Sequence, residues 1–247
     1  MKESRYKKFT GIILNTRSGD NQDKLLIIFT KEYGKIQIVA KGARNSHSKF
    51  ASATEPGLLC YGMAYFKTAE SVGYLQEMTP HEQFIQRLPS YTHYLYQSYF
   101  LELTGALFSW NDIHENIFIT LQAVLLRLHK NTSYCTLLAR IYEWKLIEQS
   151  GIAPDMREFT KPAFDLKKYE LLELSSIVHS NTAMLLLPEV ISLLQVFSGL
   201  HWPKLETVVI SDAAHKQLSR VLPGLLIGYI GREPRSYVMI QQSVEIS

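Results

Sequence analysis

The chain has 247 residues, of which 46% are hydrophobic and 20% charged, and its formal net charge is +3. This composition is typical of a globular protein with a buried core and excludes a disordered or collagen-like chain. The two cysteines, Cys60 and Cys135, stand far apart, which excludes a disulfide framework and a cysteine-based zinc cluster and indicates a reducing compartment. The sequence has no signal-peptide pattern and no unbroken run of about 20 apolar residues, so we expect neither secretion nor a membrane span.

The charge is concentrated at one end of the chain. Residues 1–50 carry a balance of +7, whereas residues 51–247 carry −4. A basic segment on an otherwise acidic chain favours an anionic partner for that segment, although a solvated lysine-rich surface is the alternative.

The first 78 residues predict a small β-barrel. The second and third predicted strands are joined by a short link in which Gly34 can take a positive φ, which predicts a hairpin. Glycines inside several strands relieve crowding where strands coil sharply, as in a five-stranded Greek-key barrel. The predicted strands cover residues 9–14, 25–30, 36–40, 58–66 and 72–78.

After residue 80 the hydrophobic period becomes helical. We therefore expect an α+β protein with two domains, a strand-built domain at residues 1–79 and an all-helical domain at residues 80–247. Residues 151–165 predict a loop, and the last dozen residues predict an extended or irregular tail. The predicted helices cover residues 91–107, 117–128, 137–147, 168–179, 188–198 and 211–229.

Capping residues mark the ends of these helices. Asn111 or Asp112 can cap the second helix, and Ser133 can cap the third, because short polar side chains accept hydrogen bonds from the first free N–H groups. Gly151 is placed to stop the third helix.

No motif of a catalytic class is present. The sequence lacks the phosphate-binding loop, the dinucleotide fingerprint, the nucleophile elbow and the paired-histidine zinc motif. The cluster of carboxylates and imidazole from Asp112 to Glu115 is better explained by helix capping and dipole pairing than by catalysis or metal binding. We therefore expect no enzyme, no catalytic residue and no cofactor.

Two other groups of residues favour structural interpretations. Aromatic residues at helical spacing could stack nucleic-acid bases, but such residues are more often core, and we interpret them as core. These residues are Tyr91, Tyr94, Tyr96, Tyr99 and Phe100. Lys167 and Lys168 are interpreted as a solvated charge pair.

The barrel carries the positive signal for function. Its Lys and Arg residues fall at strand ends and in loops, where they can reach a phosphate backbone without being buried. Aromatic residues next to them can stack on bases regardless of sequence. The predicted nucleic-acid-binding residues are Arg5, Lys7, Lys8, Arg17, Lys24, Lys35, Lys41, Arg44 and Lys49, and their aromatic neighbours are Tyr6, Phe9, Tyr33, His47 and Phe50.

Three segments of the barrel, at residues 9–14, 23–35 and 39–44, resemble the opening of the RecO family of bacterial recombination mediators. The loop Lys41-Gly42-Ala43-Arg44 is the most specific part of the resemblance. Weaker similarity continues at residues 140–151 and 231–236.

The resemblance implies an N-terminal OB-fold, a helical domain, and binding of single- and double-stranded DNA without sequence preference. It also implies strand annealing, partnership with RecR and the single-strand binding protein SSB, indirect action on the RecA recombinase, and a place in the bacterial cytoplasm at the nucleoid. Many family members hold a four-cysteine zinc site, whereas residues 151–174 contain no cysteine here. We therefore predict a cysteine-free form of this region and no metal.

The partner-binding residues are predicted from the helical domain. A receptor for the SSB tail needs a shallow apolar pocket with Arg or Lys at its rim. Arg140 and Trp144 on one helix, and Arg232 and Arg235 in the late turn, are the candidates, although Arg140 could instead pair with Glu143 or Glu148. Two other functions stay open at this stage: an interaction hub in which the barrel only tethers the assembly to DNA, and an OB-fold RNA-binding protein.

Overall fold

The computed structural model describes residues 5–45, 47–50, 53–68, 71–85, 87–130, 134–155, 159–176, 183–199 and 208–245. The chain forms two compact units. The first consists of Met1–Ser133 and Arg235–Ser247, and the second of Tyr134–Pro234. The predicted division at residues 79 and 80 stays a prediction. No helix in the described part of the chain is long and apolar enough to cross a membrane.

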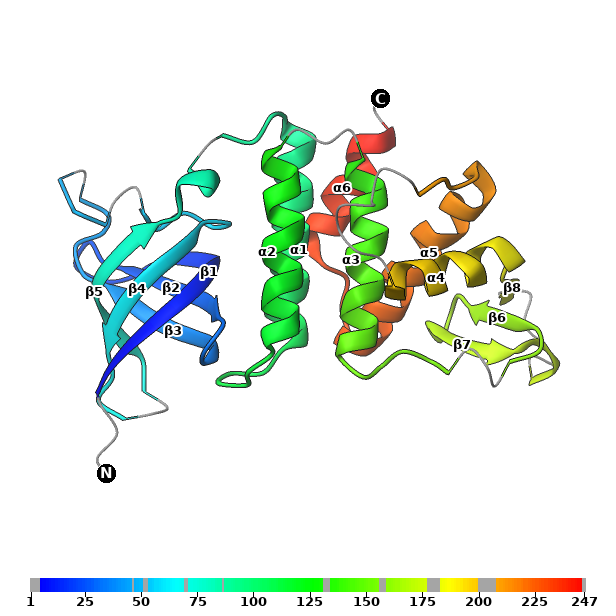
Figure 1. The fold of residues 1–247 in the computed structure, drawn as a ribbon, viewed down its shortest axis with the longest axis horizontal. Helices are drawn as coiled ribbons and strands as arrows, with labels where there is room; N and C mark the ends of the chain where they lie inside the picture. The colour runs from blue at the N-terminus through cyan, green and yellow to red at the C-terminus, as the bar shows by residue number, and fades with distance from the viewer. Residues whose placement is uncertain are drawn as a thin grey trace. The chain divides into compact units, whose positions relative to one another are not determined.

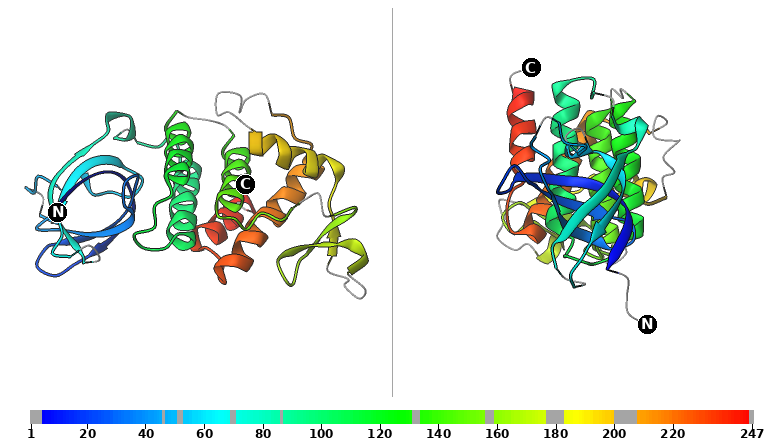
Figure 2. Two further views of the ribbon diagram at one scale, coloured as in Figure 1. Left: turned by 60° about the horizontal axis from the view of Figure 1, so that its bottom comes forward. Right: turned by 90° about the vertical axis from the view of Figure 1, so that its left-hand side faces the viewer.

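The first unit contains the predicted five-stranded barrel (Figures 1 and 2). The strands are β1 (Tyr6–Ser18), β2 (Lys24–Thr30), β3 (Gly34–Ala40), β4 (Leu59–Tyr65) and β5 (Gly73–Pro80). They close in the order β1-β2-β3-β5-β4, with β3 and β5 parallel and the other neighbours antiparallel. The barrel confirms the predicted OB-like architecture. Strand β1 runs past the predicted end at Leu14 because its second half pairs with β2.

Alternating apolar residues fill the barrel. Leu26, Ile28 and Ile38 are fully buried, as expected where every second side chain points inward. Gly62 pairs with Phe9 across β1 and β4, and a Cβ at Gly62 would collide with the Phe9 ring. A glycine at this position therefore lets the aromatic ring occupy the barrel.

Three helices belong to the same unit: α1 (Tyr91–Leu107), α2 (Glu115–His129) and α6 (Arg235–Glu245). A short 3₁₀ turn, η2 (Glu82–Phe84), precedes them. Ser90 caps α1 by accepting a hydrogen bond from the His93 N–H. The predicted caps of α2 are wrong, because α2 begins after His114 and has no side-chain cap.

Helix α6 replaces the predicted extended tail. Tyr237 and Ile240 are buried, and the Tyr237 ring stacks on Tyr99 of α1 at 5.6 Å between centroids. The Glu102 carboxylate accepts hydrogen bonds from the Arg235 and Ser236 N–H groups, which satisfies the first free donors of α6. The prediction failed because these stabilising partners belong to α1 and are not local in sequence.

The second unit combines three helices with a small sheet (Figure 1). The helices are α3 (Cys135–Gln149), α4 (Pro188–Gly199) and α5 (Asp212–Ile230). The sheet has the order β7-β6-β8, from β6 (Pro162–Asp165), β7 (Glu170–Glu173) and β8 (Ala183–Leu185), and the 3₁₀ turn η4 (Leu174–Ser176) follows β7. The predicted cap Ser133 lies outside the described residues.

A tight turn explains why the helix predicted at residues 168–179 is wrong over residues 168–176, while residues 177–179 lie outside the described residues. The Asp165 carboxylate accepts hydrogen bonds from the Lys167 and Lys168 N–H groups, and Tyr169 takes a φ of 57°. The turn returns the chain antiparallel to β6, so Leu171 pairs with Phe164. The predicted loop at residues 151–165 likewise ends in strand β6, whose residues are all buried.

Candidate nucleic-acid interface

The loop that follows β3 presents two cations on a fixed backbone. The Asp23 carboxylate accepts a hydrogen bond from the Gly42 N–H at 2.7 Å, and the Arg44 N–H donates to the Gln22 carbonyl at 2.9 Å. Gly42 takes a φ of +63°, which suits glycine, and Ala43 is buried. The loop is therefore held at its backbone, while the side chains of Lys41 and Arg44 remain exposed.

Two lysines of residues 41–50 reach towards β5. The Lys41 ammonium lies 5.2 Å from the centroid of the Tyr74 ring, and the Lys49 ammonium donates to the Gln76 carbonyl at 3.1 Å. Tyr74 is 42% exposed, so the cation and the ring share one solvent-facing surface. A cation over an aromatic face keeps its charge and still offers donors to a phosphate.

The two ends of β1 extend this surface. The Arg5 guanidinium donates to the Tyr65 hydroxyl at 3.3 Å, and the Lys7 ammonium lies 4.9 Å from the centroid of the Tyr33 ring. Arg17, near the other end of β1, is exposed. Among the described residues, no carboxylate lies within ion-pair distance of Arg17, Lys41, Arg44 or Lys49, which leaves these charges available to an anionic ligand.

The structure separates three predicted cations from this surface. The Lys24 ammonium is paired with the Glu55 carboxylate at 3.0 Å. The Lys35 side chain is buried, donates to the Gly105 carbonyl at 2.7 Å and lies against the Trp110 ring, and burial lowers the pKa of its ammonium. Lys35 therefore ties β3 to α1 instead of facing solvent. Lys8 lies two residues after Tyr6 on β1, on a face that also carries the Glu32 and Glu77 carboxylates.

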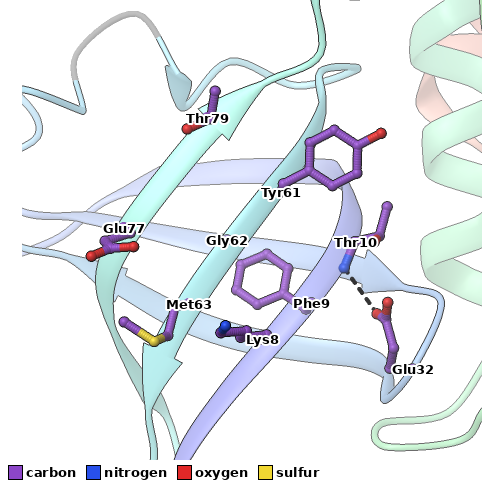
Figure 3. Close-up of a pocket in the computed structure, with 9 residues that line it drawn as sticks. All are labelled: Lys8, Phe9, Thr10, Glu32, Tyr61, Gly62, Met63, Glu77 and Thr79. Carbon is purple, nitrogen blue, oxygen red and sulfur yellow. Dashed lines mark hydrogen bonds between the residues drawn. The ribbon is translucent and has the colours of Figure 1, made fainter.

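That face holds a shallow hollow of about 370 Å³ (Figure 3). Figure 3 shows Tyr61 and Met63 of β4 and Glu77 of β5 around it, with the Glu32 carboxylate accepting a hydrogen bond from the Thr10 N–H. Lys8 is the cation among its lining residues, and Glu32 and Glu77 oppose it, so the hollow does not favour a polyanion.

The aromatic residues predicted to lie beside these cations also divide into buried and exposed ones. Phe9 and Phe50 are buried, and Tyr33 is half-buried beneath Lys7, whereas Tyr6 is 55% exposed. The helical aromatic group also divides: Tyr96, Tyr99 and Phe100 are core as interpreted, but Tyr91 and Tyr94 are exposed. That interpretation is therefore wrong for two of these five residues.

A buried thiol and the grouping of possible metal ligands bear on the predicted absence of catalysis and of metal. The Cys60 thiol donates to the Gly11 carbonyl, and burial raises the pKa of this thiol to about 12, which keeps it protonated. Within the described ranges, no three His, Cys, Asp or Glu side chains are grouped so that they could hold a metal. The predicted absence of metal and of catalysis stays a prediction.

The sequence matches two family domains in succession. Residues 1–84 match the domain described as "Recombination protein O N terminal", and residues 88–237 match "Recombination protein O C terminal". The chain belongs to the recombination protein O family. The predicted RecO resemblance is confirmed, and the barrel followed by helices is the layout expected of this family.

Proteins named "DNA repair protein RecO" are similar to this chain along most of its length. The protein of Halalkalibacterium halodurans is 24% identical over 244 residues, covering 96% of this chain and 95% of its own. The protein of Clostridium kluyveri is 23% identical over 243 residues, covering 96% and 94%. The protein of Alkaliphilus metalliredigens is 28% identical over 149 residues, and this match spans 60% of each chain. RecO proteins are DNA repair proteins, and the chain is a member of that group.

Of the four residues predicted to bind partner proteins, two are buried and two are exposed. The Arg140 guanidinium is buried and pairs with the buried Glu143 carboxylate at 2.7 Å, and Trp144 is buried with its Nε1 donating to the Ser198 hydroxyl. Arg140 therefore forms the pairing with Glu143 that the sequence left open, and its part in partner binding stays a prediction. Arg232 and Arg235 are exposed.

A second hollow, of about 490 Å³, lies within the first unit between the start of α1 and the segment before β4. Phe84, Leu58 and Ile85 line it with apolar atoms, and the exposed side chains of Tyr91 and Tyr94 line it as well. Arg87 is the arginine among its lining residues, and Glu55, whose carboxylate pairs with Lys24, is a carboxylate among them. Sequence reasoning missed this hollow because its walls come from separate segments. Alternation in the fourth and fifth strands was the available signal for the half-buried Tyr65 and the exposed Tyr74, which were also missed.

Proposed function

We propose that this RecO-family chain binds single- and double-stranded DNA, anneals complementary strands and helps load RecA onto SSB-coated DNA, without catalysing a reaction, at the nucleoid in the bacterial cytoplasm. The observation that carries the proposal is the loop clamped by Asp23, which presents Lys41 and Arg44 beside the exposed Tyr74. Family membership supports a role in DNA repair.

The physical basis of annealing is charge neutralisation. Two anionic strands repel until cations replace their condensed counterions, and release of those counterions favours binding. Arg17, Lys41, Arg44 and Lys49 can supply this neutralisation without ATP. Contacts to phosphate carry no sequence information, which agrees with binding that has no sequence preference.

The test is the salt dependence of DNA binding by the double variant Lys41→Glu/Arg44→Glu. Each lost phosphate contact lowers the log–log slope by about 0.7 for a single strand and about 0.9 for a duplex. The matched control is Lys216→Glu/Arg220→Glu, which makes the same charge change at exposed positions of α5 in the second unit. A folded double variant with the slope of the wild type contradicts the proposal, as does a control with the same loss.

The alternatives give different results in the same assays. An RNA-binding OB-fold protein would bind a matched RNA strand more tightly than DNA. An interaction hub would bind DNA but fail to anneal complementary, SSB-coated oligonucleotides without other partners.

The second hollow supports the partner part of the proposal. We place the receptor for the SSB tail there, because an apolar pocket with a cation at its edge suits a peptide that ends in apolar residues and a carboxylate. Arg87 takes the role predicted for Arg140, and RecR is proposed as a further partner. Titration of a labelled SSB C-terminal peptide should show at least about fivefold weaker binding by Arg87→Ala, as expected for a charge-assisted contact, and no change in Arg220→Ala, which removes an exposed arginine of α5. Equal affinity in both variants excludes this hollow.

A further inference from the structure

One rung of the barrel carries three tyrosines side by side. The strand registers pair Tyr6 of β1 with Tyr65 of β4, and Tyr65 with Tyr74 of β5. Residues paired directly across a sheet point to the same face. Tyr6, Tyr65 and Tyr74, which we call the tyrosine rung, therefore form a row on the outer surface of the barrel.

The rings of this row remain accessible and are held in place. Tyr6 is 55% exposed and Tyr74 is 42% exposed, and the Tyr6 and Tyr65 ring centroids lie 5.3 Å apart with their planes inclined by 60°. Arg5 donates to the Tyr65 hydroxyl. The exposed ring faces therefore do not serve the barrel core, which is filled by the inward residues of the same strands.

The rung continues around the barrel and ends on a cation. Tyr74 pairs with Val39, Val39 with Leu25, and Leu25 with Arg17. Val39 and Leu25 are half-exposed, so the strip remains apolar between the tyrosines and Arg17. Lys41 lies over the Tyr74 ring, and Arg5 lies at the other end of the tyrosine rung.

An apolar strip with cations at its ends favours a ligand of particular chemistry. The ligand must offer apolar planar faces and an anionic backbone at the same time. Unpaired nucleobases on a phosphodiester strand meet both conditions, whereas a duplex hides its base faces inside the stack. An acidic peptide offers the charge but not a succession of planar faces.

We propose that the tyrosine rung stacks unpaired bases and so makes the barrel favour single strands over duplex, while Lys41 and Arg44 hold the phosphates of either. The proposal rests on DNA binding by the same surface and adds the residues that distinguish the two forms. A strand held by its bases on the rung would present its phosphates to the cations at the edges.

The test compares Tyr74→Leu with Tyr74→Phe in the full chain, using a single-stranded oligonucleotide, the same strand with abasic sites, and a duplex. Stacking contributes about 1–3 kcal/mol per base, so Tyr74→Leu should bind the single strand roughly 5- to 150-fold more weakly. Tyr74→Phe keeps the ring and should retain the wild-type affinity. Duplex affinity and the salt slope should not change in either variant. Tyr229→Leu, at an exposed position of α5, is the matched control and should bind as the wild type does.

The abasic strand separates stacking from a general loss of binding. Wild-type protein should lose affinity for it, and Tyr74→Leu should show little further loss. An equal loss for duplex and single strand, an equal loss on the abasic strand, or no loss at all overturns the proposal. Weakened binding of a protein partner with unchanged DNA affinity assigns the rung to that partner and also overturns it. If the wild-type protein binds no form of DNA, the proposed function is contradicted. If the wild type binds DNA but Tyr74→Leu binds the single strand equally well, only the stacking role of the tyrosine rung is contradicted.

Discussion

Two loops in this chain are held by an aspartate that accepts backbone N–H groups, and they leave their lysines in different surroundings. In the barrel, Asp23 accepts the Gly42 N–H and fixes the loop that carries Lys41. In the second unit, Asp165 accepts the Lys167 and Lys168 N–H groups. Lys41 lies over an exposed tyrosine ring, whereas Lys168 pairs with the Glu170 carboxylate at 3.6 Å. An exposed lysine is therefore not by itself available to a polyanion. Its availability depends on whether a nearby carboxylate already pairs with it.

Arginines differ in the same way between the two units. Arg44 and Arg17 are exposed on the barrel, while Arg140 is buried against Glu143 in the second unit. A buried ion pair costs desolvation and depends on both of its partners, whereas an exposed cation can exchange water for a ligand. The following changes test these differences, from the largest expected effect to the smallest.

Glu143→Ala should lower the free energy of unfolding of the second unit by about 3–5 kcal/mol, because it leaves the Arg140 guanidinium buried without its carboxylate. Chemical denaturation measures the loss. The matched control is Glu55→Ala, which removes the carboxylate from the more exposed Lys24 pair and should cost less than about 1 kcal/mol. A similar small loss in both variants would mean that Arg140 does not depend on this pair.

Asp23→Ala separates the clamp from simple charge. It removes a negative charge, so electrostatics alone predicts tighter DNA binding, whereas loss of the clamp on Gly42 predicts weaker binding. We expect weaker binding, by about threefold or more, with a stability loss of about 1–3 kcal/mol from the charge-assisted hydrogen bond. Fluorescence anisotropy with a labelled strand measures the affinity. Asp165→Ala is the control, which should lose stability without losing DNA affinity.

The stability contributed by Asp165 should depend on pH. The Lys167 N–H is the main cause of a lowered pKa for the Asp165 carboxyl, and the Lys168 N–H adds to it. A lowered folded pKa contributes stability that is fully present above the ordinary pKa of 3.8 and is lost as the pH falls through the folded value. The difference in unfolding free energy between wild type and Asp165→Asn should therefore be larger at pH 7 than at pH 3. A difference that does not change with pH would show that charge plays no part in the turn.

Lys168→Ala should have the smallest effect. Its ion pair with Glu170 is exposed, and such pairs contribute about 0–1 kcal/mol. DNA affinity should not change, unlike that of Lys41→Ala, which loses a cation beside Tyr74. Equal losses of DNA affinity in the two variants would remove the distinction between the two turns.

Much of the fold was predictable because its signals are local. Short apolar runs bounded by turn-rich stretches predicted the strands, glycines within them predicted the barrel, and three- and four-residue spacing predicted α1, α2 and α3. The helix predicted at residues 168–179 failed because the turn at Asp165 and pairing with β6 outweighed the local pattern. Helix α6 was missed because Glu102 and Tyr99 on α1 provide its cap and its packing.

The sequence by itself determined the class of the barrel, the excess of cations in its first 50 residues and the loop at Lys41 and Arg44. Only the tertiary structure decided which cations stay in water, since Lys35 and Arg140 are buried by segments distant in the chain. The tyrosine rung also needed the structure, because Tyr6, Tyr65 and Tyr74 meet only through the register of β1, β4 and β5. Local patterns predicted the barrel strands and helices α1, α2 and α3, whereas helix α6, burial and cross-strand partners depend on contacts between residues far apart in the chain.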